Sequence, residues 1–144
     1  MAAKKKAPNA KLIAMLNKAL GWELRAHAMY AHYAAYVKGL ESIALGEHFE
    51  EESVESVGHA KKVRDIIATL GGVAITDRDP APIVHTEDTM VMLEEALKTE
   101  SAAAAAYARM LPLVKGQPVH QHTIVHIMMD EMKAVTEVET LLGR

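Results

Sequence analysis

The chain of 144 residues contains no cysteine and only one phenylalanine and one tryptophan. The lack of cysteine excludes disulfides, thiolate zinc sites and cysteine nucleophiles. It also fits a reducing compartment, so we expect a cytoplasmic protein. With so few large aromatic side chains, the core must be built from Leu, Ile, Val, Met and Ala, a composition that suits closely packed helices. The length is sufficient for one domain with a sizeable core.

The chain also lacks a strong charge of one sign and a long apolar run. Its formal net charge is −3, so no overall field draws it to nucleic acid or to a membrane surface. No apolar run is long enough to cross a bilayer, and residues 1–10 lack the apolar segment of a signal peptide. We therefore expect neither membrane nor nucleic acid as a partner, and we assign residues 1–8 to a flexible basic tail.

Glycine and proline are few, and their positions divide the rest of the chain into four helical segments. We expect Gly39 and the pair at 71–72 to end the first two helices, and Thr86 to cap the start of the third. Pro112 and Gly116 should end the third helix. The first two predicted helices cover residues 9–38 and 41–70. The third begins at 87 and ends at the turn formed by 112–116, and the fourth runs from 117 nearly to 144. Two prolines mark residues 73–85 as a long connection.

This pattern predicts an all-α domain over residues 9–144, a four-helix bundle of two helical hairpins joined by a long crossover. Polar residues recur at matching places in it. Glu23 and Tyr30 are seven residues apart on the first predicted helix, and Glu100 and Tyr107 repeat that spacing on the third. Seven residues are almost two helical turns, so each pair lies along one otherwise apolar stripe.

The inward stripes of the other two predicted helices carry His59 and Glu131. A carboxylate facing the core is costly unless it is paired, protonated or bound to a cation. Taken singly, an inward glutamate or histidine is more often a hydrogen-bonded core residue, and each tyrosine is explained as core. Together, three carboxylates and one imidazole in one layer predict a metal site, and this donor set suits iron, manganese or zinc.

Several motifs resemble those of bacterioferritins, and more loosely rubrerythrins. Residues 22–30 resemble the first-helix motif, 52–61 the second, and Glu100 with residues 130–141 the third and fourth. The resemblance implies a ferritin-like fold that binds iron. It implies terminal ligands at Glu23, His59 and Glu100, a bridging ligand at Glu131, and Tyr30 and Tyr107 orienting the carboxylates during catalysis.

The resemblance is incomplete at two ligand positions. The second bridging glutamate falls on Ser56, and the second histidine falls on Ala134. Glu55 is one position out of register and could reach a metal only if its helix shifts or bulges. We therefore predict one reasonable iron position and one weak or vacant one, which leaves open whether the chain oxidises Fe(II). Haem is not expected, because Val57 stands where the family has its haem-binding methionine.

The resemblance implies iron uptake and storage by a homo-oligomer, a dimer or a larger assembly. The chain ends just after the fourth helix, so a complete bacterioferritin cage is not expected. Two alternatives remain. One is a non-catalytic structural bundle with a degenerate site. The other is a DNA-protecting miniferritin, suggested by the lysines at 4–6, although that family's intersubunit ligands would fall on Ala34, Lys61 and Asp65.

Two further clusters are interpreted as surface. His122 and His126 have a spacing that could hold a surface metal, but a polar helix face, which also carries His120, is the simpler interpretation. We assign His48 and the acidic residues around it, Glu47 and Glu50 to Glu52, to a solvated helix face.

Overall fold

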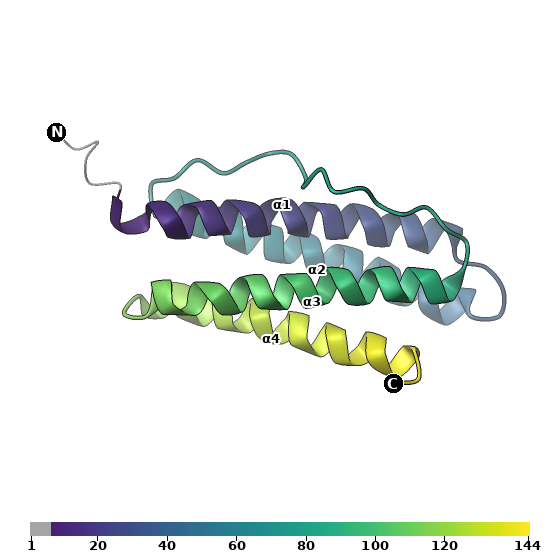
Figure 1. Cartoon of the computed structure of the whole chain (residues 1–144). Helices are drawn as coiled ribbons and strands as arrows, with labels where there is room; N and C mark the ends of the chain where they lie inside the picture. Colours follow the sequence, from purple (N-terminus) through teal and green to yellow (C-terminus); the bar gives the residue numbers. More distant parts are fainter. Residues whose placement is uncertain (1–6) are drawn as a thin grey trace.

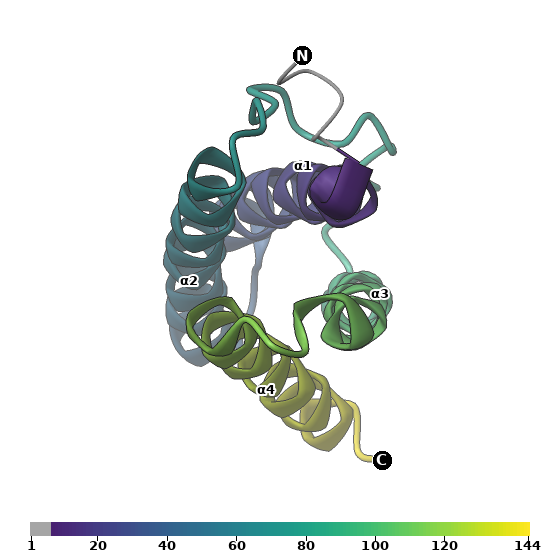
Figure 2. The ribbon, with the colours of Figure 1, turned by 90° about the vertical axis from the view of Figure 1, so that its left-hand side faces the viewer.

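The computed structural model describes residues 7–144. Its four helices are α1 (Ala7–Tyr36), α2 (Ser42–Thr69), α3 (Thr89–Val114) and α4 (Pro118–Leu141), and no strand occurs among the described residues. Helices α1 and α2 form one hairpin and α3 and α4 the other, and the four surround a common centre (Figures 1 and 2). This confirms the predicted all-α bundle of two hairpins. Residues 1–6, which hold the lysines of the predicted tail, lie outside the described part.

The predicted helix ends are correct for α2 and need correction for α3. Thr86 does not cap α3, because the N-cap is Asp88, whose carboxylate accepts hydrogen bonds from the amides of Met90 (2.9 Å) and Val91 (3.5 Å). Pro112 does not end the helix either. It lies within the last turn, which continues to the fully buried Val114. A proline removes one backbone donor, and the packing of Val114 is sufficient to keep the turn helical.

The core consists of two apolar clusters at different heights in the bundle. One contains Leu16, Val63, Met110 and Ile124, with ten further buried residues. The other contains Tyr30, Phe49, Met92 and Val138 and lies toward the opposite end. The predicted polar residues fall in the sequence between the members of these two clusters on every helix. The metal-site candidates therefore form a layer between two hydrophobic regions.

The crossover, residues 70–88, runs along the outside of α1 to the start of α3 (Figure 1). Side chains of α1 hold it in place. Asn17 bonds the backbone of Val73 and Ile75, and Tyr33 donates to the carbonyl of Val84 at 2.8 Å. At Gly21 the two segments approach so closely that an added Cβ would lie 3.0 Å from Cδ1 of Ile75 and 3.3 Å from the amide nitrogen of Asp79.

Arg25 makes the most extensive of these contacts. Its guanidinium donates to the carbonyls of Ala81 (3.1 Å) and Pro82 (2.8 Å) and to the hydroxyl of Thr99 (3.3 Å). It also lies over the ring of Trp22, 4.7 Å from the centroid. This buried arginine therefore ties α1, the crossover and α3 together, on the same helix that carries Glu23.

Candidate metal centre

Each helix contributes one of the four predicted polar ligands to the layer between the two apolar clusters. Glu23 from α1, His59 from α2, Glu100 from α3 and Glu131 from α4 are all buried, with 2–4% of their surface exposed. Burial of three carboxylates in one layer disfavours their charged forms. The structure thus places together the residues that the sequence patterns selected.

Glu23, His59 and Glu131 form the tightest group. Their potential ligand atoms lie within 4.8 Å of one another. Nδ1 of His59 is 2.7 Å from Oε1 of Glu131 and 3.5 Å from Oε1 of Glu23. Neither oxygen lies in the direction of a ring N–H, so Nδ1 makes no well-formed hydrogen bond within residues 7–144. A buried ring nitrogen that is close to two carboxylates yet lacks a directed hydrogen bond is suited to bind a cation at this point.

The other nitrogen of His59 faces the outer side of the bundle. Nε2 lies 3.0 Å from Oδ2 of Asp130 and 3.7 Å from Oε1 of Glu55. A carboxylate on the far ring nitrogen fixes the tautomer and orientation of a metal-binding histidine. Asp130 is placed to do this. Glu55, whose side chain is 44% exposed, lies beside Nε2 and not with the buried carboxylates around Nδ1.

The two tyrosines connect α1 and α3 in a reciprocal way. The hydroxyl of Tyr107 on α3 donates to Oε1 of Glu23 on α1 at 2.7 Å. The hydroxyl of Tyr30 on α1 donates to Oε1 of Glu100 on α3 at 2.5 Å. Burial raises the pKa of both hydroxyls well above the usual value, so both remain donors. Each tyrosine therefore orients the buried carboxylate of the opposite helix.

The charges in this layer depend on one another. Burial lowers the pKa of His59, but the adjacent carboxylates of Glu131 and Glu23 outweigh it and raise that pKa to about 11. Burial raises the pKa of Glu131 to about 6. Burial, together with Glu131, raises the pKa of Glu100 well above its usual value. In the absence of a metal ion, the His59 imidazolium is the cation that balances these carboxylates.

The layer is asymmetric. Ser56 and Ala134 are both buried but offer no strong metal ligand. On the Glu100 side, the carboxylate has Tyr30 and Glu131 as partners. Glu100 is not part of the group formed by Glu23, His59 and Glu131. The arrangement can hold one ion with two carboxylates and one imidazole, and its second position has fewer donors.

Sequence reasoning missed a second group, formed by His48, Glu52 and Glu137. Their ligand atoms also lie within 4.8 Å of one another, and all three residues are partly buried. Burial, with a smaller effect of Glu100, raises the pKa of Glu52 to about 8. The spacing of four residues between His48 and Glu52 could have indicated this group, but Glu137 lies on another helix and no local pattern links it to them.

His122 and His126 stack on each other at 4.3 Å between ring centroids. They belong to no group of potential ligands found among the described residues. Within residues 7–144, none of the helices combines the length and the apolar character that crossing a membrane requires.

Residues 13–144 match the sequence model of the family described as ferritin-like domain. Among solved structures, the chain resembles a ferritin-like, diiron-carboxylate protein from Bacillus anthracis, with 29% identity and a TM-score of 0.87. That alignment covers 94% of this chain and 98% of the other. No curated protein sequence matches the chain.

Two further solved structures share the fold. A bacterioferritin from Desulfovibrio desulfuricans is 24% identical with a TM-score of 0.86, covering 96% of this chain and 81% of that one. The bacterioferritin-related protein from Bacteroides fragilis, a dodecameric thioferritin, is 24% identical with a TM-score of 0.87. That alignment covers 93% of this chain and 85% of the other. These agree with the predicted bundle and its long crossover.

Proposed function

Because the chain belongs to the ferritin-like family, we propose that it is an iron-binding protein that takes up Fe(II) at the layer between its two apolar clusters. One observation carries this proposal. Nδ1 of His59 is buried beside the carboxylates of Glu23 and Glu131, and it has no directed hydrogen bond among the described residues. Two carboxylates and one imidazole suit iron, zinc and manganese.

The chain's own residues have distinct tasks in this proposal. Glu23, His59 and Glu131 bind the ion, and Glu100 holds the weaker second position. Tyr107 and Tyr30 orient Glu23 and Glu100 through their hydroxyl donors. Asp130 holds the outer nitrogen of His59 at 3.0 Å, so that Nδ1 points inward. Glu55 is proposed to guide the ion toward the outer side of His59.

Oxidation of Fe(II) is the finer part of the proposal. The Bacillus anthracis relative is described as a diiron-carboxylate protein, and a two-iron site serves electron transfer from both ions to one oxidant. Here Ser56 and Ala134 deprive the second position of two donors. We therefore propose uptake at one strong position, with oxidation slower than two complete positions would support.

Assembly into a homo-oligomer is also proposed. Its support is the dodecameric Bacteroides fragilis relative, together with large apolar residues exposed on the outside of α2. Ile43 is 85% exposed, and Val54 is 73% exposed. Light scattering on the purified full chain measures the assembly directly, and a monomer at micromolar concentration would contradict the proposal.

The test of the iron site is a calorimetric titration of the metal-free chain with Fe(II) under anaerobic conditions. The variant Glu131→Gln removes a ligand charge at nearly constant shape, and it should abolish the tight binding step. Glu139→Gln on the same helix is the matched control, because Glu139 belongs to neither group of ligands, and it should bind as the wild type does. A wild-type chain without binding, or equal binding by Glu131→Gln, would instead favour a structural bundle with a degenerate site.

A further inference from the structure

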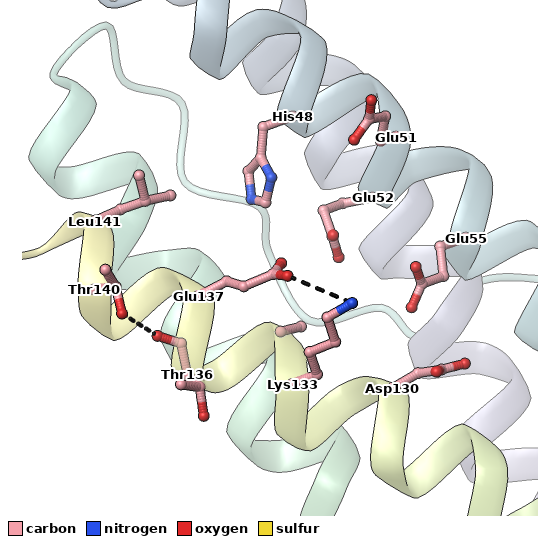
Figure 3. A pocket seen from close by; sticks show the side chains of 11 residues that line it. His48, Glu51, Glu52, Glu55, Asp130, Lys133, Thr136, Glu137, Thr140 and Leu141 are labelled. Atoms are coloured by element: carbon pink, nitrogen blue, oxygen red, sulfur yellow. Dashed lines mark hydrogen bonds and ion pairs between the residues drawn. The ribbon is translucent and has the colours of Figure 1, made fainter.

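A pocket of about 530 Å³ opens between α2 and α4, beside the metal centre (Figure 3). Its walls are rich in carboxylates. Glu51, Glu52 and Glu55 come from α2, and Asp130 and Glu137 come from α4. Asp130 and Glu55 are also the residues that face the outer nitrogen of His59. The pocket therefore leads from solvent to the outer side of the buried layer.

Within this pocket, His48, Glu52 and Glu137 point toward one another from the two helices (Figure 3). Their ligand atoms lie within 4.8 Å of one another. Nε2 of His48 is buried and finds no hydrogen-bond partner in the part of the chain that the structure describes. An unsatisfied imidazole nitrogen calls for a partner, and the two carboxylates beside it supply the remaining donors and the negative charge that a divalent cation requires.

The positions of these residues explain why the group forms here. Glu52 lies one turn before Ser56 on α2, and Glu137 lies one turn after Ala134 on α4. Each helix thus lacks one of its two expected ligands at the buried layer, and carries a carboxylate at the next turn toward the pocket. His48 is four residues before Glu52, so both side chains lie on one face of α2.

Lys133 is the cation that competes for this group. Its ammonium lies 3.9 Å from Oε1 of Glu137, but the lysine side chain is 78% exposed. An exposed ion pair of this kind contributes little, and Glu137 is the residue with which Lys133 pairs among the described residues. A divalent ion bound by His48, Glu52 and Glu137 would replace the ion pair between Lys133 and Glu137.

We propose that His48, Glu52 and Glu137 form a second divalent-cation site, open to solvent and separate from the buried group of Glu23, His59 and Glu131. One imidazole with two carboxylates suits first-row ions such as Fe(II), Zn(II) and Mn(II). Three protein donors leave positions for water, as in sites that exchange their ligands. The ion held there lies between solvent and the buried layer.

The test uses Zn(II), which does not change oxidation state, in calorimetric titrations of the metal-free full chain. The wild type should bind two ions per chain in separate steps. Glu137→Gln and His48→Gln should each weaken one step by about tenfold or more and leave the other unchanged. Glu51→Gln removes the same charge from the same pocket without touching the group, and it should keep both steps.

The buried site is distinguished by the variant Glu131→Gln, which should lose the other step and retain the one that depends on Glu137. If that variant binds as the wild type does while Glu137→Gln and His48→Gln lose a step, the proposed iron site is wrong and the pocket site stands. If Glu137→Gln and His48→Gln both bind two ions with wild-type affinity, the pocket site is overturned. Helical circular dichroism of each variant confirms that it is folded.

Discussion

The two ring nitrogens of His59 have different surroundings, and this difference organises the buried layer. Nδ1 faces Glu131 and Glu23, while Nε2 faces Asp130 at 3.0 Å. A protonated ring can balance the inner carboxylates when no metal is present. A metal ion needs Nδ1 deprotonated, so binding must release a proton. In the proposed site, the same histidine would therefore serve either as the balancing cation or as a ligand.

A substitution at Tyr107 tests how much the hydrogen bond to Glu23 contributes to stability and to metal affinity. The variant Tyr107→Phe removes the hydroxyl that donates to buried Glu23 at 2.7 Å. We expect a loss of about 2 kcal/mol in the free energy of unfolding, since the variant leaves a buried carboxylate without its hydrogen-bond donor. Metal affinity should fall as well, because Glu23 is no longer oriented. Urea denaturation and calorimetry measure the two effects.

The control for this variant is Tyr36→Phe, because Tyr36 is on the same helix as Glu23 and its side chain is 40% exposed. It should change neither the unfolding free energy nor the affinity. Equal losses in both variants would show that the hydrogen bond to Glu23 has no special role.

Ser56 and Ala134 provide a test of the second metal position. The double variant Ser56→Glu and Ala134→His supplies two donors at buried positions that now have none. If the chain takes up Fe(II) as proposed, the initial rate of Fe(II) oxidation should rise by about tenfold in this variant. The near-ultraviolet absorbance of Fe(III) measures that rate. Ser56→Gln with Ala134→Leu is the control, since it fills similar space without ligands. An equal rate in both double variants would mean that the second position does not limit oxidation.

The residues of the buried group were predictable because local patterns select them. Glu23 and Glu100 interrupt apolar stripes, and His59 and Glu131 do the same on the other two helices. All four are buried in the structure. His48 and Glu137 were not predictable in this way. They lie at the edge of a pocket between two helices, and residues at such an edge look like solvated surface until the helices are placed.

At the scale of whole elements, the crossover depends on α1 for its position. The variant Arg25→Met leaves the carbonyls of Ala81 and Pro82 without their donor and removes a buried charge. We expect a loss of about 2–3 kcal/mol in the free energy of unfolding. Amide hydrogen exchange should become faster at residues 73–85. Arg64→Met on the exposed face of α2 is the control, and equal effects of the two would contradict the anchoring role.

The same elements show which parts of a helix pattern are reliable. The glycine signals predicted the turn between α1 and α2, where Gly39 has φ +82°, and the end of α2, where Gly71 has φ +81°. The start of α3 was misplaced because Thr86 and Asp88 are both good capping residues, and only the path of the crossover decides between them. Thr86 instead accepts a hydrogen bond from the amide of Asp88 at 3.0 Å.

At the scale of the molecule, the bundle places an ionisable layer between two apolar clusters. Each cluster contains residues from all four helices, so the layer cannot move to solvent without separating the helices. The unfavourable free energy of burying these ionisable groups therefore lowers the stability of the whole fold. A cation bound as proposed would reduce this unfavourable free energy, and the stability of the bundle would then depend on metal concentration.

The raised pKa values of the buried groups predict how the stability of the metal-free chain depends on pH. In the folded state the pKa of Glu131 is about 6 and that of Glu52 is about 8, against a usual value of 4.5. The folded chain therefore binds more protons than the unfolded chain above pH 4.5, and the stability these groups contribute is lost as pH rises through their folded values. His59 acts in the same direction, because its pKa is raised from 6.5 to about 11.

We therefore expect the melting temperature of the metal-free chain to fall between about pH 5 and pH 8. Excess Zn(II) should raise the melting temperature more strongly at the upper end of that range, since the metal binds deprotonated ligands. Scanning calorimetry with a chelator and with Zn(II) measures both trends. Glu52→Gln removes one of the titrating groups, so its metal-free melting curve should vary less with pH than that of the wild type. A melting temperature that rises with pH in the presence of chelator would show that the pKa values of Glu131, Glu52 and His59 are not raised in the folded chain.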